Sequence, residues 1–403
     1  MFQNKSKLIV IILLFFCFSL KAADFRPAPP ELYAHSAILF DVNSGFLLFE
    51  KNADDVIPPA SMTKLMTMHI VFNAIREGRL SLDQYIPISA EASFKSSPPR
   101  SSLMFIEEGQ IVTLFELMKG LAIPSGNDAA VAVAEAVAGS VPAFISMMNR
   151  EARRMGLEQT FFDDASGFSA YNKTTAREFA RFCFFYIQEN PEAIPLFHSF
   201  REFTYPLSHN IPEGSTSALG PIGQFSNNIL LGRVEGVDGL KTGFIYASGF
   251  NIALTAERDG RRLLAVLMGG PRRNGAALRA RDGEALLSYG FDNYTTFYPQ
   301  LPELSRNRVY KGRAKNVELT VMVPAITLPN ADVDAITWEI EWGAPLVAPF
   351  PAGTEAGMIR LLDKENSLIF SRSIVTAIEV ERGSFFRRFF DSIALFFKRI
   401  FAS

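Results

Sequence analysis

The pattern of apolar positions divides residues 24–292 into strands, then helices, then strands again. Two apolar runs between residues 36 and 49 flank the turn-forming Asn43-Ser-Gly45, which predicts a pair of strands. Helical spacing of apolar residues follows in five segments: 65–75, 113–121, 128–138, 142–155 and 175–189. Strand-like segments return at 251–257 and 263–269, before a last predicted helix at 276–289. This order indicates an α+β domain with a helical insert.

A different pattern begins after residue 292 and predicts a second domain. Apolar and polar residues alternate at 317–321 and at 336–342, where Trp338 and Trp342 fall on one face. Prolines and glycines interrupt these segments at short intervals, which predicts a small β-sandwich over residues 293–383. The segment contains no cluster of residues suited to chemistry, so we interpret it as a spacer or interaction module.

The last segment, residues 384–403, has the pattern of a basic amphipathic helix. Polar residues recur at helical spacing along one side: Arg387, Arg388, Asp391, Ser392, Lys398 and Arg399. Nine large apolar side chains fill the other side: Phe385, Phe386, Phe389, Phe390, Ile393, Phe396, Phe397, Ile400 and Phe401. Such a helix is suited to lie in a membrane interface, so we expect residues 384–403 to bind a membrane surface. The alternative is a terminal helix that docks on its own domain.

Residues 1–23 have the pattern of an export signal. Lys5 and Lys7 precede an apolar run, and Ala22-Ala23 supplies the small residues of a cleavage site. The run is shorter than the roughly 20 residues that a spanning helix needs, although a retained N-terminal anchor is the alternative. Removal of the signal would leave Cys183 as the single cysteine, so no intramolecular disulfide is expected.

Composition and charge exclude several classes of function. The formal net charge of −2 argues against a nucleic-acid-binding surface. The four histidines are scattered without the spacing of a zinc hydrolase, and no G-x-S-x-G elbow occurs. We therefore expect no nucleic-acid partner, no metal and no other cofactor.

Two residues one helical turn apart, Ser61 and Lys64 in Ser61-Met-Thr-Lys64, are the candidate nucleophile and base. A serine hydroxyl is a poor nucleophile until a neighbouring base takes its proton, and Lys64 can do so only when neutral. The apolar helix that follows would remove water from Lys64, and Lys241 would repel a second cation. Both effects lower the pKa of an amine.

Two further motifs, Ser125-Gly-Asn127 and Lys241-Thr-Gly243, complete the candidate site. Ser125 could relay a proton to a leaving amine, and Asn127 could bind a substrate peptide bond, with Asp128 capping the next helix. The alternative for this motif is an ordinary turn and helix cap. Lys241 and Thr242 would bind a terminal carboxylate on a strand edge, and Gly243 would let the substrate backbone come close.

The motifs occur within segments 56–67, 123–130 and 237–243, which together resemble the low-molecular-mass penicillin-binding proteins of peptidase family S11. The resemblance implies a transpeptidase-like domain over 24–292 of the penicillin-binding-protein and β-lactamase type, followed by the β-rich domain and the amphipathic helix. It also implies roles for the motif residues: Ser61 as acylated nucleophile, Lys64 as base, Ser125 and Asn127 as the middle motif, Lys241, Thr242 and Gly243 as the carboxylate-binding strand, and the backbone N–H groups of Ser61 and Phe244 as the oxyanion hole.

The resemblance further implies a function and a location. The chain would be a serine-type D-alanyl-D-alanine carboxypeptidase that removes the terminal D-alanine from peptidoglycan pentapeptide stems, with β-lactams as covalent inhibitors. It would lie in the periplasm, attached by its tail to the outer face of the inner membrane. One position departs from the family, since Phe244 stands where histidine is common. Because the oxyanion donor is main chain, we expect catalysis to survive this difference.

Three alternatives share some of these features. A class A β-lactamase would carry a deacylating glutamate in an E-x-x-L-N segment, and none lies between Asn127 and Lys241. A DD-endopeptidase that cuts cross-links would share every motif. A non-catalytic peptidoglycan-binding scaffold is the third alternative, although the intact Ser61 and Lys64 weigh against it.

Overall fold

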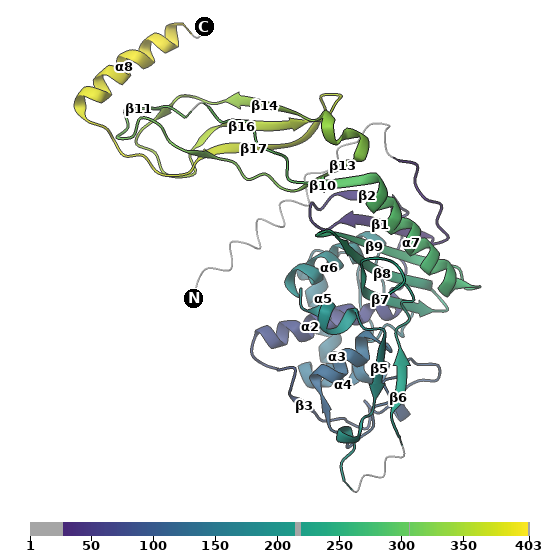
Figure 1. Ribbon diagram of the computed structural model, residues 1–403. Coiled ribbons are helices and arrows are strands. Elements are labelled where there is room, and N and C mark those ends of the chain that lie inside the picture. Colours follow the sequence, from purple (N-terminus) through teal and green to yellow (C-terminus); the bar gives the residue numbers. More distant parts are fainter. Residues whose placement is uncertain (1–26, 214–218, 306, 402–403) are drawn as a thin grey trace. The chain divides into compact units, whose positions relative to one another are not determined.

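The computed structural model describes residues 27–213, 219–305 and 307–401 (Figure 1). The chain divides into two compact units between Asp292 and Asn293. The predicted export signal, residues 1–23, lies outside the described residues.

The first unit contains a five-stranded antiparallel sheet in the order β2-β1-β9-β8-β7 (Figure 1). Its strands are β1 (Ser36–Asp41), β2 (Leu47–Lys51), β7 (Val237–Ile245), β8 (Gly249–Arg258) and β9 (Arg261–Gly270). The strand pair predicted around Asn43-Ser-Gly45 is confirmed as β1 and β2. β1 also pairs with β9, and all its residues are buried because helices lie on both faces of the sheet.

Helix α7 (Gly275–Asn293) covers one face of this sheet, and α6 (Ala176–Glu189) lies against the other (Figure 1). Glycines let α7 approach closely: a Cβ added at Gly290 would lie 2.7 Å from Leu263 Cδ1. The predicted closing helix is therefore confirmed, and it runs four residues further than expected, to Asn293.

The helical insert contains five helices, each with both ends within one residue of its predicted position: α2 (Lys64–Arg76), α3 (Leu114–Ala122), α4 (Asn127–Ala138), α5 (Val141–Arg154) and α6. α2 is the central helix, and ten of its 13 residues are buried. Thr113, Ser140 and Thr175 begin α3, α5 and α6 by accepting a hydrogen bond from a first-turn backbone N–H. Gly139, in the left-handed conformation, ends α4.

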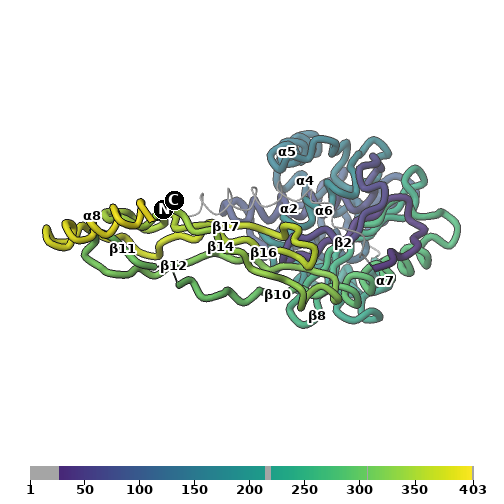
Figure 2. The backbone as a smooth tube through the Cα atoms, turned by 90° about the horizontal axis from the view of Figure 1, so that it is seen from above, coloured from purple at the N-terminus to yellow at the C-terminus, as the bar shows by residue number. Residues whose placement is uncertain are grey.

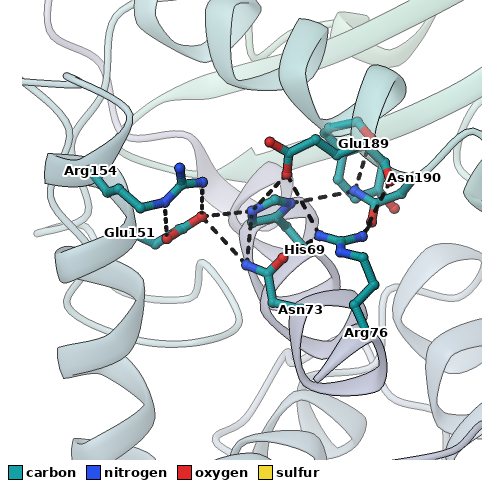
Figure 3. A network of polar contacts seen from close by, with 8 residues as sticks. His69, Asn73, Arg76, Glu151, Arg154, Glu189 and Asn190 are labelled. Atoms are coloured by element: carbon teal, nitrogen blue, oxygen red, sulfur yellow. Dashed lines mark hydrogen bonds and ion pairs between the residues drawn. The ribbon is translucent and has the colours of Figure 1, made fainter. Parts of the chain in front are cut away.

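A partly buried polar network joins α2, α5 and the end of α6 (Figure 3). The fully buried His69 of α2 lies 2.9 Å from Glu151 Oε1 of α5, and Asn190 Nδ2 lies 3.4 Å from its other ring nitrogen. Burial alone would raise the pKa of Glu151, but hydrogen bonds from Arg154 and His69 bring it down to about 2. The charged carboxylate therefore fixes α5 against α2, the helix that carries Lys64.

Shorter elements complete the first unit. The small strands pair as β3 (Tyr85–Ile86) with β4 (Val112–Thr113), and β5 (Glu202–Tyr205) with β6 (Ile222–Phe225). The short helical turns are η1 (Ala60–Thr63), η2 (Phe94–Ser96), η3 (Ile194–His198) and η4 (Ser208–Asn210).

The second unit contains a four-stranded antiparallel sheet in the order β12-β17-β16-β14, of which β14, β16 and β17 are labelled in Figure 1. Its described elements are β10 (Tyr294–Phe297), β11 (Val309–Tyr310), β12 (Leu319–Thr320), β13 (Ile326–Pro329), η5 (Asn330–Ala335), β14 (Thr337–Trp342), β15 (Leu346–Val347), β16 (Glu355–Leu362), β17 (Leu368–Thr376) and α8 (Phe385–Ile400). β10 pairs with β13, and β11 pairs with β15. The predicted alternation in β14 is confirmed, because Trp338 and Trp342 pack on the core while Glu339 and Glu341 face solvent.

α8 contacts its own unit through its polar side, next to β11 (Figure 2). The half-buried backbone N–H of Lys311 donates to Asp391 Oδ2 at 2.6 Å, and Arg387 Nη2 donates to the carbonyl of Ala314 at 2.9 Å. The nine large apolar residues of its other side are each between 41% and 81% exposed. The polar side of α8 therefore contacts its own unit, as in the alternative prediction of a docked helix. Its apolar side is exposed.

Among the described residues, no single helix is both long and apolar enough to cross a membrane. One bent pair, α4 with α5 at 82°, meets the criteria of length and composition.

Candidate active site

The candidate nucleophile lies in a tight turn, the nucleophile turn (residues 58–63), that leads directly into α2. Ala60 has a φ of +51°, which is a strained backbone conformation for a residue other than glycine. This bend leaves Ser61 partly exposed and places Lys64 as the first residue of α2, fully buried. The structure brings the two together, with Lys64 Nζ 3.2 Å from Ser61 Oγ.

Lys64 makes two further hydrogen bonds, both to carbonyl oxygens. Its Nζ donates to Asn127 Oδ1 and to the backbone oxygen of Ser166, each at 2.7 Å. A neutral amine has two hydrogens and one lone pair. The two carbonyl oxygens accept both hydrogens, so the lone pair of neutral Lys64 is directed at the Ser61 hydroxyl.

The surroundings of Lys64 favour this neutral form. Burial lowers the pKa of Lys64 from 10.5 to about 7, against the opposing effect of the Asp164 and Asp128 carboxylates. The predicted lowering by desolvation is therefore confirmed. The repulsion expected between the two lysines is present too, but it acts on the pKa of Lys241.

The middle motif sits where α3 gives way to α4. Ser125 has a φ of +67°, and its buried hydroxyl has no hydrogen-bond partner among the described residues. Asn127 begins α4, and no side chain caps this helix, so the motif is not an ordinary cap.

Asp128 does not cap α4, and that prediction was wrong. Its carboxylate accepts hydrogen bonds from the backbone N–H groups of Met104, Phe105 and Ile106, as well as from Ala129. The backbone N–H of Asn127 donates to the Ser102 carbonyl at 2.8 Å. Asp128 therefore holds the segment 102–106 against the middle motif.

The third motif lies on β7, the edge strand of the sheet. Lys241 is buried and donates to the Thr242 carbonyl at 3.2 Å. Burial, together with the positive charges of Lys64 and Arg279, lowers the pKa of Lys241 strongly. A bound carboxylate would oppose this lowering and favour the ammonium form.

Gly243 packs against the nucleophile turn, which is a contact that the sequence did not predict. A Cβ added there would lie 2.6 Å from the Pro59 carbonyl and 3.2 Å from the Met62 nitrogen. The missing side chain therefore lets β7 approach the nucleophile turn. β7, which contains Phe244, thus packs on η1, which contains Ser61. A shared oxyanion hole would require the two backbone N–H groups to lie close together.

The sequence patterns missed a loop that supports Lys64, which we call the Ser166 loop (residues 163–172). Asp164 accepts hydrogen bonds from the backbone N–H groups of Ser166 and Ser169, and Asn172 donates to the same carboxylate. Gly167 has a φ of +82°, and a Cβ there would lie 1.9 Å from the Ala60 carbonyl. The Ser166 loop thus packs directly on the nucleophile turn.

Arg279 of α7 was also missed. Its guanidinium is buried, donates to the Asn227 carbonyl at 2.7 Å and acts electrostatically on Lys241. It adds positive charge at the end of the site where a carboxylate is expected. In the part of the chain that the structure describes, no group of three or more His, Cys, Asp or Glu residues could hold a metal ion.

The fold matches solved penicillin-binding proteins. Penicillin-binding protein 5 from Haemophilus influenzae superposes with a TM-score of 0.76 at 30% identity, covering 88% of this chain and all of that one. Penicillin-binding protein D2 from Listeria monocytogenes, solved in a cefotaxime-bound form, superposes with a TM-score of 0.56 at 27% identity, covering 66% of this chain and all of that one. The predicted fold class, a penicillin-binding-protein-like α+β domain, is confirmed.

Sequence comparison narrows the class to one family. The model of the D-alanyl-D-alanine carboxypeptidase family, peptidase S11, matches residues 23–272. The D-alanyl-D-alanine carboxypeptidase DacD of Escherichia coli K12 is 32% identical over 381 residues, which cover 93% of this chain and 94% of that protein. The chain therefore belongs to the D-alanyl-D-alanine carboxypeptidase family of serine hydrolases. The β-lactamase, endopeptidase and scaffold alternatives are not favoured.

Proposed function

We propose that this chain removes the C-terminal D-alanine from peptidoglycan pentapeptide stems, through an acyl-enzyme on Ser61. The observation that carries the proposal is the geometry of Lys64, whose two N–H groups are taken by carbonyl oxygens while its third contact is Ser61 Oγ. In this arrangement the lone pair of the neutral amine is free to accept the serine proton.

Acylation would proceed in two proton transfers. As Ser61 Oγ bonds to the carbonyl carbon of the penultimate D-alanine, its proton moves to neutral Lys64. The backbone N–H groups of Ser61 and Phe244 would stabilise the negative charge that develops on the carbonyl oxygen. The peptide C–N bond then breaks, and the leaving amine takes a proton from Lys64 through the Ser125 hydroxyl, which has no other partner among the described residues.

Deacylation would reverse these roles with water in place of the amine. Lys64 takes a proton from a water molecule that attacks the ester, and Ser61 is regenerated with a shortened stem released. Lys241 and Thr242 would bind the terminal carboxylate, while Asn127 holds the acyl side of the peptide. A β-lactam would acylate Ser61 in the same way, because its carbonyl and carboxylate occupy the same positions.

The function is tested with purified protein and a pentapeptide muropeptide. We expect conversion to the tetrapeptide with one free D-alanine for each stem, and covalent labelling by a fluorescent penicillin. Ser61→Ala should lose both activities while retaining the fold. Labelling that persists in Ser61→Ala would contradict the assignment of the nucleophile.

We further propose that the protein works in the periplasm, with α8 in the interface of the inner membrane's outer face. The nine outward apolar side chains support this location, since burying each stabilises by about 1.5–3 kcal/mol. The basic residues Arg387, Arg388, Lys398 and Arg399 would each add about 1 kcal/mol on anionic lipid.

A further inference from the structure

The side chain of Phe244 has no role in the mechanism above, although it borders the site. Its backbone follows the Lys241-Thr-Gly243 motif, and its ring is 45% exposed at the end of the edge strand β7. A large aromatic ring left half in water beside a catalytic centre is available to a ligand.

The alternation of β7 shows which face of the strand the ring occupies. Gly243 faces the nucleophile turn, as does Asn251, its partner on β8, which donates to the Pro58 carbonyl. Thr242 and Phe244 therefore point to the opposite face of the sheet, the face that α7 covers. The hydroxyl expected to bind the substrate carboxylate and the Phe244 ring are thus neighbours on one face.

The ring rests on a rigid support. Phe250 lies directly across from Phe244 on β8, and the two ring centroids are 4.4 Å apart with planes inclined by 37°. Phe250 is itself held from behind by α7: a Cβ at Gly275 would lie 2.1 Å from its ring, and Arg279 sits 5.5 Å from the ring centroid. Phe250 therefore covers part of the Phe244 ring, and Phe244 as a whole still remains 45% exposed.

We propose that the Phe244 ring contacts the side chain of the departing residue and selects a small apolar one. This inference rests on the proposed function. Side chains two positions apart on a strand face are roughly 7 Å apart, so a residue whose carboxylate binds Thr242 lies within reach of the Phe244 ring. A methyl group gains contact with the ring, whereas a charged side chain loses hydration against it.

The test measures kcat/KM for D-alanine release from diacetyl-L-lysyl-D-alanyl-D-alanine, and for glycine release from the matching peptide that ends in glycine. Because the loss of one methyl group from an apolar contact changes kcat/KM by about tenfold or more, we expect the wild-type chain to prefer D-alanine to that extent. Phe244→Ala should reduce the preference to roughly twofold, and Phe244→Leu should keep most of it.

Phe225→Ala is the matched control, because Phe225 is 69% exposed on β6 and belongs to no motif. It should leave the preference unchanged. If Phe244→Ala retains the full preference while still labelling with penicillin, the inference is overturned and the proposed function stands. If the wild-type chain releases no D-alanine, the proposed function fails and this inference fails with it.

Discussion

Lys64 combines complete burial with three polar contacts. Burial sets the protonation state, and the contacts set the direction of the lone pair. Either property alone would leave Ser61 with a neighbour that cannot take its proton. The reactivity of the site is therefore a joint product of α2, α4 and the Ser166 loop.

The pKa of Lys64 predicts a pH dependence for acylation. Since this pKa is about 7, the amine is charged below pH 7 and cannot accept the serine proton. The rate of labelling by a fluorescent penicillin should therefore rise about tenfold for each pH unit up to pH 7, and then level off. The same profile is expected in His35→Gln, which removes an exposed histidine on the same unit. A rate that is flat between pH 5 and 8 would refute Lys64 as the base.

Gly167→Ala tests the contact between the Ser166 loop and the nucleophile turn. The new methyl group would clash with the Ala60 carbonyl, and the φ of +82° at this position is unfavourable for alanine. The nucleophile turn must therefore shift by about 1 Å. Such a displacement is expected to lower the penicillin acylation rate about 100-fold. Gly223→Ala on β6 is the control, because a Cβ there meets nothing within 4 Å. Equal acylation rates in the two variants would contradict this role of Gly167.

Site residues that contribute a side chain within a motif could be predicted from the sequence, and the one that contributes a backbone oxygen could not. The roles proposed for Ser61, Lys64 and Lys241 use their side chains, so their identities are visible in the motifs. Ser166 contributes its backbone oxygen, which any residue type could supply, and no sequence pattern marks it. Arg279 lies on a helix far along the chain, and only the packing of α7 on the sheet brings it near Lys241.

At the scale of elements, the long helices and the central strands were predictable because their apolar spacing extends over several periods. The short strands β3, β4, β5 and β6 have two to four residues each, too few to show a period. The role of Asp128 was predicted wrongly for a related reason. A carboxylate near a helix start resembles a cap in sequence, but here the fold supplies three other N–H groups for it to bind.

The outward apolar side of α8 predicts that this helix determines membrane binding. The full chain should float with vesicles of phosphatidylethanolamine and phosphatidylglycerol, and a chain ending at residue 383 should stay in solution. Penicillin labelling should be equal in both, since α8 belongs to the second unit and the motifs to the first. Flotation of the shortened chain would place the membrane-binding surface elsewhere. Pure phosphatidylcholine vesicles should bind the full chain more weakly, because the basic residues lose their partners.

At the scale of the whole molecule, the first unit joins segments that are far apart in the sequence. All six residues of β1 pair with β9, although the helical insert separates the two strands in the sequence. In the sequence, the nucleophile turn follows β1 and β2, whereas Lys241 lies on β7, just before β8 and β9. The same sheet therefore positions both the nucleophile turn and Lys241. This explains how a single contact, such as that of Gly243 with Pro59, can keep the motifs together.

The pairing of β1 with β9 has a consequence for the newly made protein. A nascent chain cannot close the sheet until the ribosome has passed Gly270, so Ser61 and Lys241 stay apart through most of synthesis. Contacts of such long range form slowly, which keeps the polypeptide extended for longer. A polypeptide of this kind can be threaded through a translocation pore before it folds, as the proposed periplasmic location would require.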